Sequence, residues 1–155
     1  MRKPATLITG ANGEMGHGLI TTLHEKNYRN IVALDLNQLD DSINNYCTEE
    51  IIGNIVDVDL IDQLNGEYEF DDIYHLAALL SSRAEFSPQS AHDVNVGGTI
   101  NLLNLALEQG RSQGKQIKFF FPSSIAVYGL KDLEEKEIAG AIKENSYRNP
   151  STMYG

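Results

Sequence analysis

A glycine-spaced run, Thr9-Gly10-Ala11-Asn12-Gly13-Glu14-Met15-Gly16, follows the β-prone segment Ala5–Thr9 and precedes a segment with helical periodicity. In a strand–turn–helix unit the first glycine of G-x-x-G-x-x-G permits a sharp turn, and the second lets the backbone approach a pyrophosphate. The third glycine permits close packing of the helix on the strand. The start of the helix adds free N–H groups and the positive end of the helix dipole. The run therefore predicts a dinucleotide-binding turn in which Asn12 and Met15 take part. The alternative is a tight β–α turn that uses glycine for geometry alone.

An acidic residue follows the second predicted strand, Asn30–Asp35, at the place where the ribose of a bound dinucleotide is held. Asp35 comes 19 residues after Gly16, and a carboxylate there accepts hydrogen bonds from the adenosine ribose hydroxyls. The same charge repels a 2′-phosphate, and residues 36–46 contain no Lys or Arg that would attract one. The sequence therefore predicts NAD rather than NADP as the cofactor.

The third predicted strand, Glu50–Val58, ends at a second candidate cofactor contact. Asp57 at this strand end would accept a hydrogen bond from the adenine amino group, while Val58 would pack on the adenine ring. Asn54-Ile55 is the competing register for the same two contacts.

Strand-like and helical segments alternate along the whole chain, which predicts crossover units and a parallel sheet. The five predicted strands are Ala5–Thr9, Asn30–Asp35, Glu50–Val58, Asp72–Leu76 and Ile117–Phe121. The predicted helices carry apolar stripes at Met15, Leu19 and Leu23, at Leu60, Ile61 and Leu64, and at Val96, Ile100, Leu103 and Leu107, the last helix ending at Gly110. Residues 130–148 are charged and helix-permissive and are expected to form a surface excursion. The fold class is therefore α/β, a Rossmann-type doubly wound parallel sheet of about five strands.

Composition excludes several classes of partner and site. The 155 residues include 12 Lys+Arg and 22 Asp+Glu, a net charge of -10, which argues against nucleic-acid binding and against adhesion to anionic membranes. One cysteine, Cys47, forms no internal disulfide and fits a reducing compartment, and no apolar run reaches membrane-spanning length, so a cytoplasmic location is expected. The four histidines show no metal-ligand spacing, so no metal site is expected, and His75 is expected to line the cofactor groove at a strand end.

Three further motifs, together with the glycine run, resemble those of the extended short-chain dehydrogenases/reductases, the superfamily of nucleotide-sugar epimerases and dehydratases. They are His75-Leu76-Ala77-Ala78, Asn95-Val96, and Pro122-Ser123-Ser124-Ile125-Ala126-Val127-Tyr128-Gly129. More narrowly, Leu76 to Ser81, the PSSIAVYG run and Pro150-Ser151-Thr152-Met153-Tyr154-Gly155 resemble the short-chain type of L-threonine 3-dehydrogenase.

The resemblance implies a role for each matching residue. Gly10, Gly13 and Gly16 form the pyrophosphate turn, and Asp35 holds the ribose. The other roles fall to Leu76, Ala77 and Ala78 as the groove lining, Asn95 as the family's helix asparagine, Ser124 as the active-site hydroxyl, Tyr154 as the tyrosine of Y-x-x-x-K, and Ser81 as a residue near the substrate. Tyr128 is assigned a packing role.

The implied chemistry is the oxidation of a secondary alcohol, in which a base takes the hydroxyl proton while hydride leaves for NAD. A tyrosine, with a reference pKa of about 10, serves as this base only when positive charge stabilises its phenolate. The family supplies that charge through a lysine four residues later, a position beyond Gly155. The chain is therefore expected to be the N-terminal NAD-binding part of a longer enzyme, cut within this motif, without a substrate domain and inactive by itself.

Three functions stay open at this point. The first is the NAD-binding part of an oxidoreductase acting on a small hydroxy amino acid such as L-threonine. The second is a nucleotide-sugar epimerase or dehydratase, and the third is an NAD-binding module that turns nothing over. The expected partners are a small-molecule substrate and, for the full-length enzyme, a second copy of the same chain in a homodimer.

Overall fold

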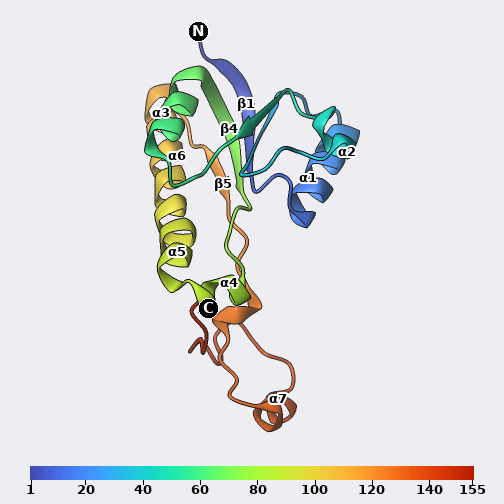
Figure 1. The fold of residues 1–155 in the computed structure, drawn as a ribbon, viewed down its shortest axis with the longest axis vertical. Helices are drawn as coiled ribbons and strands as arrows, with labels where there is room; N and C mark the ends of the chain where they lie inside the picture. Colours follow the sequence, from blue (N-terminus) through green and yellow to red (C-terminus); the bar gives the residue numbers. More distant parts are fainter.

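Five parallel strands form one sheet in the computed structural model, which describes residues 1–155 (Figure 1). They are β1 (Lys3–Thr9), β2 (Ile31–Asp35), β3 (Glu49–Ile52), β4 (Tyr68–His75) and β5 (Lys118–Phe120). The order across the sheet is β3-β2-β1-β4-β5, and each neighbouring pair is parallel. The strand order thus reverses between β1 and β4, which is the kind of switch point where open α/β sheets bind ligands. The predicted doubly wound α/β class is confirmed.

Helices cover both faces of this sheet. They are α1 (Glu14–Glu25), α2 (Asp41–Asn44), α3 (Val58–Glu67), α4 (Ser81–Phe86), α5 (Pro88–His92), a π-helical segment (Asp93–Gly98), α6 (Thr99–Gln113), a 3-10 turn (Ile125–Val127) and α7 (Leu133–Ala139). Figure 1 shows α3 and α6 on one side of the sheet and α1 and α2 on the other. None of the helices combines the length and the apolar character needed to span a lipid bilayer.

Each face of the sheet has its own hydrophobic core, because successive side chains of a strand point to opposite faces. Leu7 of β1 belongs to the core under α3 and α6, which includes Ile61 and Leu102. Its neighbour Ile8 belongs to the core under α1, which includes Ile20. The central strand is thus fixed from both sides, and the turn that follows it is held in place.

One predicted apolar stripe is buried only in part, and another is exposed. On α1, Leu23 is buried and Leu19 packs against the core as predicted, whereas Met15 is 66% exposed. Gly16 and Ile20 complete the buried face of α1. On α6 and the π-helical segment, the predicted stripe Val96, Ile100, Leu103 and Leu107 is 43–52% exposed, and the buried face carries Leu102, Leu105 and Gln109. α6 carries a second apolar stripe, and the one through Leu102 and Leu105 faces the sheet. The π-helical turn at Asp93–Gly98 separates Val96 from the regular helix, so Val96 does not continue the stripe of α6. The helix also passes Gly110 and ends at Gly114, which adopts the left-handed conformation with φ 67°.

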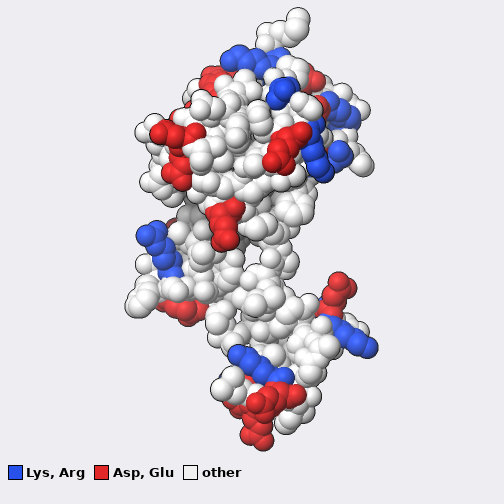
Figure 2. Space-filling model, turned by 90° about the vertical axis from the view of Figure 1, so that its right-hand side faces the viewer, with Lys and Arg blue, Asp and Glu red and all other residues white.

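The predicted surface excursion closes on itself before the chain ends. The N–H of Gly129 donates to the carbonyl of Tyr147 at 2.8 Å, so the loop between them leaves and returns at one point. Its tip is α7, whose first turn is capped by Asp132 accepting from the N–H of Glu135 at 2.8 Å. Figures 1 and 2 show this lobe projecting from the end of the molecule, away from the sheet. The excursion is therefore confirmed, and it leaves the face above the strand ends open.

Candidate functional site

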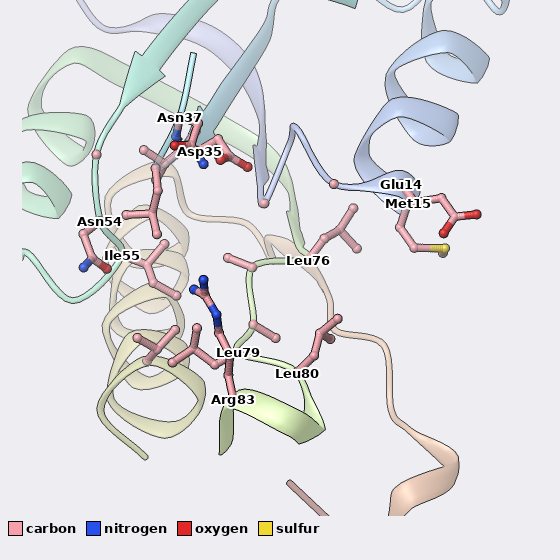
Figure 3. A pocket seen from close by; sticks show the side chains of 18 residues that line it. Glu14, Met15, Asp35, Asn37, Asn54, Ile55, Leu76, Leu79, Leu80 and Arg83 are labelled. Carbon is pink, nitrogen blue, oxygen red and sulfur yellow. Dashed lines mark hydrogen bonds between the residues drawn. The ribbon is translucent and has the colours of Figure 1, made fainter. Parts of the chain in front are cut away.

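A cavity of about 440 Å³ lies at the carboxyl ends of the strands, at the switch point of the sheet (Figure 3). Most of its lining comes from the ends of four strands and the loops that follow them, and 10 of its 18 residues are hydrophobic. The principal lining residues are Gly10 and Gly13 after β1, Asp35, Leu36 and Asn37 after β2, Gly53, Asn54 and Ile55 after β3, and Leu76, Ala77, Ala78, Leu79 and Leu80 after β4. This volume is in the range of small-molecule sites, which are mostly apolar with a few placed polar groups.

The glycine turn is packed so tightly that two of its positions have no room for a side chain. Gly10 has φ +67°, and a Cβ there would lie 2.6 Å from the backbone nitrogen of Ala77. At Gly16 a Cβ would lie 2.2 Å from the carbonyl oxygen of Ala11, so α1 rests directly on the turn. Gly16 supports the turn from behind, whereas Gly10 and Gly13 line the cavity.

The first turn of α1 offers hydrogen-bond donors at the same place. The backbone N–H groups of Glu14, Met15 and Gly16 have no acceptor within the chain, and the N-cap Gly13 contributes no side-chain cap. Glu14 and Met15 also line the cavity. Free donors at the positive end of a 12-residue helix fit the oxygens of a pyrophosphate. The residues present therefore fit a dinucleotide at this turn.

Asp35 lines the cavity and joins two of its walls. One carboxylate oxygen accepts from the N–H of Asn12 at 3.0 Å, and the other accepts from the N–H of Asn37 at 3.1 Å. Asn12 itself does not line the cavity, because its side chain binds the backbone of Gln38 and Asp40. Asn12 thus holds the glycine turn against the loop after β2. Each Asp35 oxygen accepts one backbone hydrogen bond, so each can still accept another from a ligand in the cavity.

The third strand is shorter than predicted, and the residues of the competing register are the ones that line the cavity. β3 ends at Ile52, and Asp57 is the N-cap of α3, where its side chain accepts from the N–H groups of Asp59 and Leu60. A carboxylate already bound to a helix start does not end a strand, so that part of the prediction is wrong. Asp57 and Val58 lie outside the cavity lining, whereas Asn54 and Ile55 belong to it.

The loop after β4 forms the wall opposite Asp35, with Leu76, Ala77 and Ala78 at the cavity as predicted from the resemblance. Asn95 does not reach the cavity and instead clamps this loop from the π-helical segment. Its side chain accepts from the N–H of Leu79 at 2.7 Å and donates to the carbonyl of Leu79 at 2.9 Å. Asn95 is therefore a positioning residue for the cavity wall.

His75 lies beneath the cavity wall and not in it, contrary to the prediction. Its ring is fully buried, with Nδ1 at 2.8 Å from the hydroxyl of Thr9 and Nε2 at 2.9 Å from the hydroxyl of Thr99. Thr99 also donates to the carbonyl of Asn95 at 2.6 Å, so the proton between His75 and Thr99 belongs to Nε2. Burial lowers the pKa of His75 to about 4, which keeps the ring neutral near pH 7. The result is a polar chain that ties β1 and β4 to α6.

The residues matched to catalysis come from segments that meet below the cavity. The Ser124 hydroxyl accepts from the N–H of Ala126 at 3.1 Å, and a Cβ on Gly155 would lie 2.1 Å from the carbonyl oxygen of Ala126. The N–H of Met153 donates to the carboxylate of Glu85 on α4 at 2.7 Å, and α4 begins at Ser81. Figure 1 accordingly shows the C-terminus beside α4. The structure brings the backbone around Ser81, Ser124 and Tyr154 together, with no hydrogen bond between Ser124 and Tyr154.

Arg83 of α4 is a lining residue that the sequence did not single out. The sequence does carry one sign of its importance: Arg83 is the one Lys or Arg between Arg29 and Arg111, so it is the one basic side chain near the predicted groove segments.

Known proteins share this architecture. The profile of the family described as GDP-mannose 4,6 dehydratase matches residues 7–155. An uncharacterized epimerase/dehydratase of Staphylococcus aureus is 35% identical over 152 residues, which is 96% of this chain and 43% of that protein. A monomeric L-threonine 3-dehydrogenase from a metagenome superposes with a TM-score of 0.78 at 36% identity, covering 97% of this chain and 44% of that one. L-threonine dehydrogenase of Clostridium difficile superposes with a TM-score of 0.76 at 30% identity, covering 100% and 46%.

The chain thus spans less than half the length of these relatives. The match to the family profile nevertheless covers nearly all of the chain, from the first strand through the segment that carries Tyr154. The resemblance inferred from the motifs is confirmed: the chain belongs to the NAD-dependent epimerase/dehydratase family of extended short-chain dehydrogenases/reductases and corresponds to its N-terminal portion.

Proposed function

We propose that this chain binds NAD and forms the cofactor-binding part of an oxidoreductase that transfers hydride from a small hydroxy amino acid, such as L-threonine, to NAD. The observation that carries this proposal is the cavity at the switch point. It combines the glycine turn and free α1 N–H groups on one side with Asp35 on the other.

The residues of this chain divide the work of holding the cofactor. The N–H groups at the start of α1 bind the pyrophosphate, Asp35 accepts from the adenosine ribose, and Asn54 and Ile55 hold the adenine. When bound, NAD supplies the nicotinamide ring that accepts the hydride. The Tyr154 phenolate takes the proton of the substrate hydroxyl, and the Ser124 hydroxyl donates a hydrogen bond to the reacting oxygen.

The substrate assignment draws on two relatives named L-threonine dehydrogenases, which are 36% and 30% identical to this chain. A second candidate, a nucleotide-sugar epimerase or dehydratase, is favoured by the family profile, whose description is GDP-mannose 4,6 dehydratase. A third candidate is an NAD-binding module without turnover. We further propose a homodimer for the full-length enzyme, a point to be checked directly because one threonine dehydrogenase relative is monomeric.

Calorimetric titration with NAD tests whether the chain binds the cofactor. The absorbance of NADH tests whether the full-length enzyme transfers hydride to it. We expect saturable NAD binding by the chain and NADH formation with L-threonine in the full-length enzyme. A product formed from a nucleotide sugar without net NADH would establish the second candidate. NAD binding without turnover of either substrate would establish the third. No NAD binding at all would refute the proposal.

Cofactor choice gives a prediction at Asp35. The double change Asp35→Ala with Leu36→Arg removes the ribose acceptor and the charge that repels a 2′-phosphate, and it adds a cation at an exposed cavity position. We expect the ratio of NADP to NAD affinity to rise about tenfold or more, about 1.4 kcal/mol. Asp41→Ala, on exposed α2 and outside the cavity, should leave the ratio unchanged. Equal affinity of the parent chain for NAD and NADP would contradict the role of Asp35.

Tyr154 and Tyr128 provide a matched pair for the catalytic step. In the full-length enzyme, Tyr154→Phe should lower turnover about a hundredfold while NAD affinity stays unchanged, because a proton-transfer group is lost without a binding contact. Tyr128→Phe, also half-buried, should leave turnover near that of the parent, and Ser124→Ala should have an intermediate effect. Full activity of the Tyr154→Phe enzyme would remove the assignment.

A further inference from the structure

Most of the charged side chains that line the cavity have the same sign as the pyrophosphate proposed to bind there. Glu14 and Asp35 are the two carboxylates of the lining, and Arg83 is its one cation. The chain as a whole carries a net charge of -10. A pyrophosphate brings two more negative charges into this groove. The start of α1 opposes them with only about half a positive charge, so a full cation in the cavity would add to the attraction.

Arg83 has no competing partner within the chain. None of the four ion pairs includes it, and its guanidinium makes no hydrogen bond to another residue. Figure 3 shows its side chain rising from α4 into the cavity, into the space between Ile55 and Leu76. The carboxylate of the same helix, Glu85, is two residues away, so it does not face Arg83, and it is bound to the N–H of Met153.

The base of the Arg83 side chain is held firmly although its tip is free. The next residue of α4, Ala84, is fully buried. The loop that leads into α4 is clamped at Leu79 by the two hydrogen bonds from Asn95. A free guanidinium on a fixed base reaches anions inside the cavity at little cost in ordering, and its planar fork suits two phosphate oxygens at once.

We propose that Arg83 is the phosphate clamp of this site, pairing with the pyrophosphate of the bound dinucleotide and offsetting the charges of Glu14 and Asp35. The proposal rests on the proposed function, because it takes the ligand of the cavity to be NAD. It assigns to α4 a part in cofactor binding, with the pyrophosphate held between the glycine turn and a side chain from across the groove.

The test compares ligands that differ in phosphate content on the same set of variants. Calorimetric titrations with NAD, ADP-ribose and adenosine are run on the parent chain, Arg83→Gln and Arg83→Lys. Arg111→Gln, an exposed arginine of α6 outside the cavity, is the matched control. We expect Arg83→Gln to weaken NAD and ADP-ribose about tenfold, to leave adenosine unchanged and to reduce the salt dependence of NAD binding. Arg83→Lys should recover part of the loss, and Arg111→Gln should behave like the parent.

The opposite charge change should have the opposite effect. Glu14→Gln removes a carboxylate from the lining and should strengthen NAD binding severalfold. An equal loss for adenosine and NAD in Arg83→Gln would show that Arg83 shapes the adenine end, which overturns the clamp. Unchanged NAD affinity in Arg83→Gln, with a parent chain that binds NAD, would overturn the clamp and leave the proposed function intact. A parent chain that does not bind NAD would overturn both.

Discussion

Gly10→Ala is expected to abolish measurable NAD binding and to lower the free energy of unfolding by about 3 kcal/mol. Gly10 adopts φ +67°, a conformation that costs a residue with a Cβ roughly 1–2 kcal/mol. The added methyl would also lie 2.6 Å from the nitrogen of Ala77, so the turn and the loop after β4 would have to separate. Those two segments lie side by side in the cavity lining, and their separation would distort the site.

Gly18 of α1 provides the control for this substitution. A Cβ at Gly18 meets nothing within 4 Å, and the residue is in the interior of the helix. Gly18→Ala should therefore raise the free energy of unfolding by about 0.5–1 kcal/mol through lower backbone entropy and leave NAD binding unchanged. Thermal unfolding of both variants measures the change in stability, and titration with NAD measures the change in affinity. NAD affinity in Gly10→Ala equal to that of the parent would show that the turn serves geometry alone.

Local chemistry was enough to predict the sheet and the glycine turn. Buried strands bounded by turn residues, separated by helical segments, specify crossover connections, and these require a parallel sheet. Gly16 is constrained by Ala11 within the same turn, so the glycine spacing predicts it, whereas the contact of Gly10 with Ala77 adds a constraint from a distant part of the chain. Asp35 followed from the same register, because it ends the strand beside β1.

The buried face of α6 could not be predicted because its sequence offers two apolar stripes. The stripe through Ile100 and Leu103 is apolar, but so is the one through Leu102 and Leu105, and only packing against the sheet selects the second. At Asp57, a capping side chain in the sequence Asp57-Val58-Asp59 competes with a strand ending, and the cap prevails.

Long-range contacts explain why Arg83 and His75 were missed. Arg83 acts on the cavity only because α4 is folded against the loop after β4. The partners of His75, Thr9 and Thr99, lie 66 and 24 residues away in the sequence. A histidine at a strand end has no local sign of burial, so the sequence predicts His75 at the surface of the groove.

The burial of His75 predicts a loss of stability in mild acid. Its pKa is lowered to about 4 by burial, against about 6.5 in the unfolded chain. Above pH 6.5 the neutral ring makes its full contribution to the free energy of unfolding. This contribution is lost as the pH falls toward 4, because in this range the unfolded chain binds the proton and the folded chain does not. We expect the free energy of unfolding to fall by about 3 kcal/mol from this group alone. The hydrogen-bond partners of the ring are two hydroxyls and no carboxylate, so no counter-ion would stabilise the cation.

Urea unfolding between pH 7 and pH 4 measures this loss, and two variants identify its source. His75→Gln is expected to be less stable at pH 7 but to show a flatter dependence on pH, because it has no ring to protonate. His92→Gln, at an exposed position of α5, controls for the loss of one histidine and should keep the slope of the parent. Should His75→Gln fail to fold, the ring resonances of His75 in the parent give the answer by NMR. If the ring took up its proton near pH 6.5, it would not be buried between the hydroxyls of Thr9 and Thr99. That result would contradict the hydrogen-bonded link between β1 and α6.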